Sequence, residues 1–201
     1  MPALEFFNKL GVFTQKEFLN QEERRQICDE MRLSRSSAAK VVDASGQSQL
    51  KEGVRRTQSS LVSDATTNSV REKINRLKAS LEAHFALQVG LCEEPQFLVY
   101  KVGDYFQAHQ DKGEEPGKPE YVRQRQLTVV VFLNTEQISD SEYNHSGGSL
   151  TLYGLMSDPK WSKFGFKITA EPGALVAFRA DLFHEVTPIT AGERYSIVSW
   201  F

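Results

Sequence analysis

Hydrophobic residues recur at helical spacing in the first half of the chain. In "FLNQEERRQICDEMRLS", Asn20 is followed by Glu23, the pair of residues that forms a capping box at the start of a helix. Ile27 and Met31 come next, and residues four positions apart share one face of an α-helix. The pattern predicts an amphipathic helix over roughly residues 21–32.

The stretch "TTNSVREKINRLKASLEAHFALQ" predicts the clearest helix of the chain, because its apolar residues form one stripe and its charged residues lie opposite. Between the two helices, "AAKVVDA" and "GVRRTQSSL" predict short strands around the polar hairpin or loop "SGQSQLKE". The apolar stripe of the long helix contains Val70, Ile74, Leu77, Leu81 and Phe85.

From residue 95 onward the pattern changes to short β-branched and aromatic runs separated by Gly-, Pro- and Asp-rich turns. This spacing is typical of a β-barrel or β-sandwich. We therefore predict a mainly β fold with N-terminal helices in a single domain. Residues 1–94 would form the helical support and first strands, and residues 95–201 the β-core. The runs are "PQFLVYKV", "QLTVVVFLN", "GSLTLYG", "GFKITA", "GALVAFRA", "LFHEVTPI" and "RYSIVSWF".

Two polar segments are too long for tight turns and predict mobile loops. They are "DKGEEPGKPEYVRQRQ" and "NTEQISDSEYNHSGG". His145 lies in the second, where we expect it to be solvated, with a substrate contact as the alternative. His84 lies beside the apolar stripe of the long helix, and we expect it to have a surface or packing role.

Composition excludes several classes of protein. The 201 residues are 40% hydrophobic and 25% charged, with a formal charge of −2, so a nucleic-acid partner is not expected. No apolar run approaches the roughly 18 to 20 residues of a membrane span, and "MPALEFFNKLGVFTQ" lacks the features of a secretory signal. Cys28 and Cys92 have no zinc or CxxC spacing, so we expect both to be reduced and structural, as in a cytoplasmic protein.

Candidate chemistry begins in "YKVGDYFQAHQD", where His109 and Asp111 are one residue apart at the end of a predicted strand. Side chains at i and i+2 of an extended chain point to the same face. His184 follows in "FRADLFHEVTPI". Two histidines and one carboxylate form the facial triad that binds Fe(II) and leaves coordination positions open. The alternative is the polar rim of an ordinary strand, since such a pattern often arises by chance.

The last predicted strand, "GERYSIVSWF", adds an arginine. Arg194, Ser196 and Val198 alternate and therefore share one face. A guanidinium that points into a barrel is costly without an anion, and its geometry suits bidentate binding of a carboxylate. The alternative is a surface arginine near the end of the chain.

Together these motifs resemble the Fe(II)- and 2-oxoglutarate-dependent dioxygenases, and most of all the prolyl 4-hydroxylase and oxygen-sensing prolyl hydroxylase branch. The resemblance covers about residues 95–201, with a weaker likeness over the N-terminal helices and "VRRTQSS". It implies a double-stranded β-helix, a jelly-roll-like barrel buttressed by helices. The motifs are Tyr100, His109-Gln110-Asp111, Gly147-Gly148-Ser149-Leu150, His184 and Arg194-Tyr195-Ser196.

By this resemblance His109, Asp111 and His184 would bind iron, and Arg194 would hold the distal carboxylate of 2-oxoglutarate. Tyr100 matches a tyrosine that often hydrogen-bonds the co-substrate, and Thr128 and Ser196 are secondary co-substrate candidates. One departure is Phe132, because several prolyl hydroxylases carry a tyrosine there whose hydroxyl helps to bind the distal carboxylate. Ser196 or Thr128 could compensate.

The implied reaction hydroxylates a substrate while O₂ and 2-oxoglutarate are converted to succinate and CO₂, with ascorbate as a candidate reductant. Interior residues would exclude water, although plain core packing also explains them. These are Leu150, Val130, Val176 and Phe178.

The resemblance favours a prolyl residue in a protein or peptide as the substrate, clamped by loops near residues 44–56 and 112–126. Arg179 and Trp200 are candidate substrate contacts, with an exposed strand-end charge and a core residue as the respective alternatives. Two other functions stay open: the same chemistry on a free amino acid or small metabolite, and a non-catalytic β-barrel binding module. An open groove would favour the peptide and a deep closed pocket the metabolite. The oligomeric state also stays open.

Overall fold

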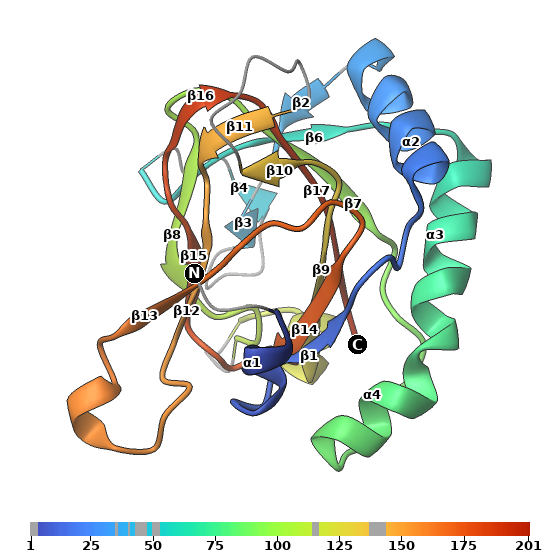
Figure 1. Ribbon diagram of the computed structural model, residues 1–201. Helices are drawn as coiled ribbons and strands as arrows, with labels where there is room; N and C mark the ends of the chain where they lie inside the picture. The colour runs from blue at the N-terminus through green and yellow to red at the C-terminus, as the bar shows by residue number, and fades with distance from the viewer. Residues whose placement is uncertain are drawn as a thin grey trace.

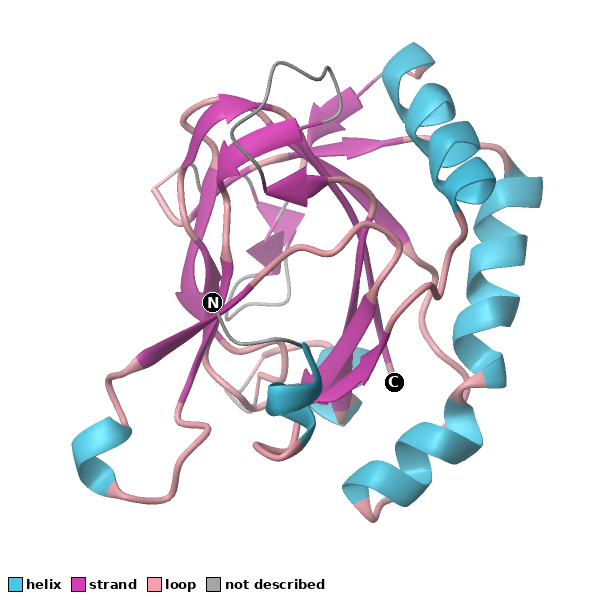
Figure 2. Cartoon of the chain, viewed as in Figure 1, coloured by secondary structure: helices cyan, strands magenta, loops and turns pink. Residues whose placement is uncertain are grey.

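The structure, a computed structural model, describes residues 4–34, 36–39, 41–42, 48–49, 53–113, 117–136 and 144–201. Two large β-sheets face each other, and helices lie along the outer face of one of them (Figures 1 and 2). Parts of the predicted loops near 44–56, 112–126 and 134–148 lie outside the described residues.

The larger sheet has seven strands and carries the helices. Its order is β1 (Phe13–Gln15), β14 (Leu175–Arg179), β9 (Leu127–Phe132), β17 (Arg194–Trp200), β7 (Gln96–Tyr100), β6 (Gln58–Ser60) and β2 (Ser36–Ala38).

The facing sheet has five strands, in the order β13 (Gly165–Ile168), β12 (Leu150–Tyr153), β15 (His184–Val186), β8 (Tyr105–His109) and β5 (Arg55–Arg56). A three-stranded sheet contains β10 (Thr135–Glu136), β11 (Asn144–Gly147) and β16 (Ile189–Gly192), and β3 (Val41–Val42) pairs with β4 (Ser48–Gln49). No strand pairing joins the two large sheets within the described ranges. They therefore form the two walls of a double-stranded β-helix rather than a closed barrel.

The apolar run of β9 explains how the sheet holds two cores. All six of its residues are buried. Leu127, Val129 and Val131 pack in a cluster with the helices, while Val130 and Phe132 pack in a second cluster between the sheets. Burial on both faces requires a continuous apolar run instead of alternation. Leu150, Val176 and Phe178 belong to the inter-sheet cluster, as expected.

The predicted first helix is confirmed as α2 (Gln21–Leu33). Its capping box is complete, because the Glu23 backbone N–H donates to Asn20 Oδ1 and the Asn20 backbone N–H donates to Glu23 Oε2, each at 2.9 Å. Ile27 and Met31 are buried against the seven-stranded sheet. The apolar spacing therefore identified the packed face correctly.

The prediction of one long second helix is wrong. The chain forms α3 (Asp64–Arg76) and α4 (Lys78–Phe85), separated at Leu77, whose N–H bonds to Ile74 O at 3.0 Å, a tighter i to i−3 turn. Leu81 is nevertheless buried in the same cluster as Ile74. Because packing continues across the break, the apolar stripe carries no sign of it.

Shorter elements complete the fold. The strand β1 and the helix α1 (Leu4–Asn8) were not expected, and Leu4 and Phe7 of α1 close one end of the inter-sheet core. Two further short helices are α5 (Glu120–Gln124) and the 3₁₀ helix η1 (Pro159–Trp161). Among the described residues, no helix has both the length and the apolar character needed to cross a bilayer.

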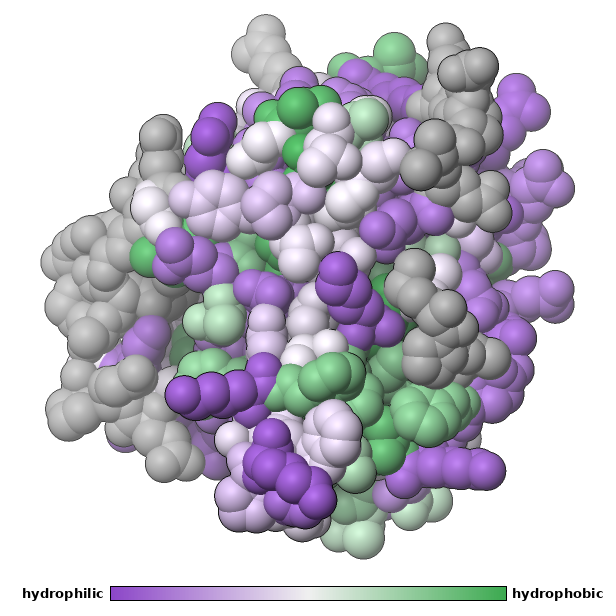
Figure 3. Space-filling model, turned by 60° about the vertical axis from the view of Figure 1, so that its left-hand side comes forward, coloured by the Kyte–Doolittle hydropathy of each residue, from purple (hydrophilic) through white to green (hydrophobic). Residues whose placement is uncertain are grey.

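The remaining sequence expectations concern the cysteines and the surface. Cys28 and Cys92 are free and buried, and burial raises the pKa of the Cys28 thiol to about 11. This pKa keeps Cys28 protonated and unreactive near neutral pH. The face in Figure 3 mixes hydrophilic side chains with a hydrophobic area in its lower half, an ordinary protein surface.

Candidate functional site

Two neighbouring strands of the five-stranded sheet bring the candidate metal ligands together. His109 ends β8 and His184 begins β15, and these two residues are direct partners in the strand register. Asp111 follows two positions after His109. Its Oδ1 lies 3.5 Å from His109 Nε2 and its Oδ2 lies 3.3 Å from His184 Nε2. One ligand atom from each of the three residues lies within 4.8 Å of the other two, so all three can bind one ion.

The backbone and one hydroxyl fix the orientation of these side chains. Nδ1 of His109 lies 2.7 Å from Gln107 O and Nδ1 of His184 lies 2.9 Å from Leu182 O. A carbonyl oxygen only accepts, so each Nδ1 donates and each Nε2 presents a lone pair to the cluster. Thr128 Oγ1 donates to Asp111 Oδ2 at 2.7 Å.

The electrostatics suit a cation. Burial opposes ionisation of Asp111, but the adjacent His184 and His109 outweigh it and hold the pKa of Asp111 well below its usual value. Burial and the neighbouring His184 lower the pKa of His109. Burial lowers the pKa of His184, but the adjacent Asp111 outweighs burial and raises it. A metal requires a carboxylate and neutral imidazole nitrogens, so it would compete with a proton at His184.

Aromatic groups pack on both imidazoles. The Phe106 ring stacks on His109 with 3.5 Å between centroids, and Phe178 meets His184 edge-on at 4.9 Å. The Arg55 guanidinium lies over the Phe106 ring, 4.7 Å from its centroid. This packing restricts the rotation of the imidazoles. Two imidazole nitrogens and one carboxylate, held on one side, are a donor set that fits Fe(II) and leaves room for further ligands.

Arg194 lies on the inner face of β17 and is only 2% exposed. Its Nη1 donates to Ser196 Oγ at 2.8 Å, as their shared face predicts, and its guanidinium carbon lies 5.2 Å from the Tyr100 ring centroid and 5.7 Å from that of Phe132. Its Nε is buried without a hydrogen-bond partner among the described residues. Burial lowers the pKa of Arg194, whereas Tyr100 and Glu136 oppose this shift.

A buried guanidinium with an unused donor fits a carboxylate ligand. No carboxylate of the described residues forms an ion pair with Arg194 within 4.0 Å. The predicted neighbours Tyr100 and Ser196 do lie around it. Thr128 does not, because its hydroxyl bonds to Asp111. The hydroxyl absent at Phe132 is therefore not replaced by Thr128.

The expectation that His145 is solvated is wrong. It lies on β11 and is 2% exposed. Burial and the nearby Arg194 lower its pKa to about 4. The sequence contains no sign of this, because β11 lies in a stretch with the composition of a polar loop and pairs with the distant strand β16. His84, in contrast, packs on Phe13 and Phe85, as expected.

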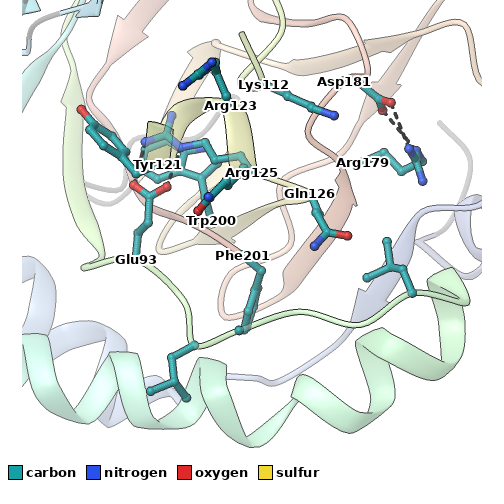
Figure 4. A pocket seen from close by; sticks show the side chains of 14 residues that line it. Glu93, Lys112, Tyr121, Arg123, Arg125, Gln126, Arg179, Asp181, Trp200 and Phe201 are labelled. Carbon is teal, nitrogen blue, oxygen red and sulfur yellow. Dashed lines mark hydrogen bonds and ion pairs between the residues drawn. The ribbon is translucent and has the colours of Figure 1, made fainter. Parts of the chain in front are cut away.

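A cavity of about 570 Å³ lies at one end of the seven-stranded sheet, and none of the three triad residues lines it (Figure 4). Lys112, the residue after Asp111, lines it, and so does Trp200, the register partner of Thr128. Arg179 also lines it, 58% exposed at its side chain and paired with Asp181 at 3.0 Å.

Sequence reasoning missed Arg125 in this cavity. Its guanidinium lies 3.8 Å from the Trp200 ring centroid, and Nε and Nη2 donate to the two carboxylate oxygens of Glu93 at 2.6 and 2.7 Å. Arg125, Glu93 and Trp200 are far apart in the chain. The pairing of β17 with β9 and with β7 brings them together, so no local signal identifies the group.

Comparison with known proteins agrees with this geometry. Residues 95–201 match the model of the 2OG-Fe(II) oxygenase superfamily. No protein with curated annotation has a significantly similar sequence. Among solved structures, a Pseudomonas putida prolyl-4-hydroxylase has a TM-score of 0.73 and 20% identity, covering 98% of this chain and 95% of its own.

Two other solved structures are similar. A Trichoplax adhaerens prolyl hydroxylase, in complex with a peptide fragment of the hypoxia inducible factor oxygen degradation domain, has a TM-score of 0.69 and 18% identity over 98% of this chain and 85% of its own. A viral collagen prolyl hydroxylase of Paramecium Bursaria Chlorella virus-1, in complex with 2OG, has a TM-score of 0.59 and 16% identity over 94% and 93%. At these identities the likeness establishes the double-stranded β-helix.

Proposed function

Because the chain belongs to the 2OG-Fe(II) oxygenase superfamily, we propose that it hydroxylates a prolyl residue in a protein or peptide. Membership makes it an oxygenase that uses Fe(II), 2-oxoglutarate and O₂. These cofactors supply the oxidising chemistry, in which 2-oxoglutarate is converted to succinate and CO₂ while the substrate gains a hydroxyl group.

The roles of the chain's own residues follow from the site. His109, Asp111 and His184 hold the metal, and Thr128 orients Asp111 through its 2.7 Å hydrogen bond. Arg194, supported by Ser196, receives the distal carboxylate of 2-oxoglutarate, and Tyr100 lines the same end. The inter-sheet cluster of Val130, Phe132, Val176 and Phe178 excludes water from the space between these groups.

The observation that carries the choice of substrate is the cavity lined by Lys112, the residue after Asp111. Its rim is open, because Tyr121 and Leu91 are 50% and 72% exposed, so a chain can enter and leave it. Trp200 is 6% exposed and forms part of the cavity wall, with the Arg125 guanidinium over its ring and Glu93 bonded to Arg125. In this proposal the prolyl ring packs against the edge of Trp200 that the wall leaves uncovered, and the polar rim suits peptide groups. The solved prolyl hydroxylase with a bound peptide supports this use of the fold.

Three further predictions belong to this proposal. Ascorbate is expected to restore enzyme that has lost its reduced iron, and a cytoplasmic location stays a prediction. Residues 1–94 are proposed as support and first strands, and residues 95–201 as the catalytic core, a division that the range matched by the family supports.

The test is hydroxylation of a peptide library followed by mass spectrometry. Each peptide has a central proline and a matched copy with alanine in its place. With Fe(II), 2-oxoglutarate and air, we expect some proline peptides to gain one oxygen atom on the prolyl residue and their alanine copies to gain none. Trp200→Leu should reduce this hydroxylation about 10-fold or more, as loss of an aromatic anchor does.

Trp161→Leu is the matched control, because Trp161, the other tryptophan of the chain, lies on η1, packs against Phe164 and does not line the cavity. Equal loss in both variants would contradict the role of the cavity. Hydroxylation of free amino acids or small metabolites, with no peptide product, would overturn the choice of substrate and leave the reaction class in place.

A further inference from the structure

His145 is a buried histidine that the proposed mechanism leaves unused. Its strand β11 lies between β10 and β16, opposite Glu136 on one side and Gly192 on the other. Its Nδ1 lies 2.9 Å from Gly147 O, but its Nε2 is buried with no hydrogen-bond partner in the described part of the chain. A buried polar atom without a partner is costly and calls for an explanation.

The side chains of His145 and Arg194 both lie close to Gly148. A Cβ added to Gly148 would lie 3.0 Å from Arg194 Cδ and 3.6 Å from His145 Nδ1. Arg194 Nε is likewise buried without a partner among the described residues. Both side chains therefore approach Gly148 from different strands, and each carries a buried polar atom without a partner among the described residues. A single polar ligand beside Gly148 would satisfy both.

We infer that His145 is a second anchor for the distal carboxylate of 2-oxoglutarate, and that it takes up a proton when the co-substrate binds. This inference rests on the proposed function and names a residue that determines co-substrate specificity. His145 would also supply the hydrogen-bond donor that is absent at Phe132, whose ring lies against Arg194.

Proton uptake follows from the tautomer. Because Gly147 O only accepts, Nδ1 carries the proton of the neutral imidazole, and Nε2 then presents a lone pair that a carboxylate would repel. Only the imidazolium donates from both nitrogens. In the free protein, burial and Arg194 hold the pKa of His145 at about 4. An opposite charge in contact raises a pKa by about 1–3 units, which moves His145 toward pH 5–7.

The charges around His145 are few among the described residues. Glu136 is its register partner on β10, and Ser149 Oγ donates to both oxygens of that carboxylate at 3.0 Å. Next to β16, Glu193 accepts from Tyr195 and lies 3.9 Å from Lys101 Nζ. Arg194 on β17 is a further charged residue near His145. Histidine is the side chain whose ordinary pKa lies nearest to pH 6–8, so we attribute the response to His145.

Calorimetric titration of 2-oxoglutarate into the protein with bound Mn(II) measures this coupling without turnover. Titrations at pH 6 and pH 8, each in two buffers with different ionisation enthalpies, give the number of protons taken up. We expect uptake of a fraction of one proton per co-substrate at pH 6 and little at pH 8, and a Kd that rises between them by up to about 10-fold, the limit reached if the pKa of bound His145 is about 7.

Two variants control for other sources of protons. His145→Gln keeps an amide donor but cannot titrate, so the uptake and the pH dependence of Kd should disappear while binding persists. His84→Gln is the matched control, because His84 also has a buried, unpartnered Nε2 but packs on Phe13 and Phe85. It should behave like the unmodified protein.

The possible outcomes separate the two proposals. Tight binding of 2-oxoglutarate with equal, pH-independent proton uptake in the unmodified protein and in His145→Gln would overturn this inference alone. Absence of binding at either pH would count against the proposed function. A long-range ¹H–¹⁵N spectrum of the unmodified protein with Zn(II) needs no variant. It should show the Nδ1–H tautomer of His145 in the free state and imidazolium with co-substrate at pH 6, and a neutral ring in both states would refute the inference.

Discussion

The two ends of the site differ in how completely their polar groups are satisfied. At the triad, the Nδ1 atoms of both histidines and one oxygen of Asp111 already have partners within 2.9 Å. At the other end, Arg194 Nε and His145 Nε2 are buried without partners in the described residues. The first arrangement presets ligand orientation, as a metal site needs. The second leaves a cost that a bound anion would relieve, as we propose for the distal carboxylate of 2-oxoglutarate.

Replacing Arg194 should have the largest effect, because it changes the anion-binding end of the site and leaves the triad residues in place. Arg194→Met should weaken 2-oxoglutarate binding by about 100-fold or more, because a buried charged hydrogen-bond partner is lost. The same variant should unfold at equal or higher temperature without ligand, since it removes a buried unpaired charge. Calorimetry and thermal unfolding measure the two effects. A variant that is less stable and binds normally would contradict the role of Arg194.

The pH dependence of stability tests His145 in the absence of ligand. Its folded pKa of about 4 lies below the ordinary value of 6.5, so the unfolded state binds a proton more readily. The neutral form therefore supports folding fully above pH 6.5, and this contribution, about 3 kcal/mol, is lost as the pH falls from 6.5 to 4. Denaturant unfolding should show the loss in the unmodified protein and a smaller one in His145→Gln. Identical pH profiles would refute burial of a neutral His145.

Thr128 tests whether the triad is oriented by its surroundings. Thr128→Val keeps the shape of the side chain but removes the donor to Asp111, and should lower metal affinity or activity by about 10–100-fold. Thr128→Ser keeps the hydroxyl and should lose far less. Metal titration and substrate turnover measure both variants. Equal behaviour of the two would mean that the hydroxyl does not matter.

Arg179 should have the smallest effect. Its guanidinium is exposed and paired with Asp181 at 3.0 Å, and such surface pairs contribute about 0–1 kcal/mol. Arg179→Ala should therefore change kcat/KM for a peptide by less than about fivefold. A larger loss in steady-state assays would place Arg179 directly on the substrate.

The sequence predicted the features that depend on local periodicity. Alternation placed Arg194 and Ser196 on one face, and the i, i+2 spacing placed His109 and Asp111 together, because strand geometry dictates both. Helical spacing identified Ile27 and Met31 as core. Each of these inferences needed only neighbours within one element.

The features that depend on tertiary register were not predictable in this way. His145 is buried by β16, which lies more than forty residues later in the chain. The group of Arg125, Glu93 and Trp200 forms only when β17 pairs with both β9 and β7. The break at Leu77 is hidden because both α3 and α4 pack on one sheet. Periodicity reports which face is buried, not what buries it.

We propose that the triad and Arg194 together couple the conversion of 2-oxoglutarate to hydroxylation of a peptide. The most direct test supplies ¹⁸O₂ to the protein with Fe(II), 2-oxoglutarate and a substrate peptide, and follows the label by mass spectrometry. We predict one labelled oxygen in succinate and one in the hydroxylated prolyl residue, in equal amounts, with both products absent in His184→Ala. Succinate that forms at the same rate in His184→Ala, or a product oxygen derived from water, would contradict the account.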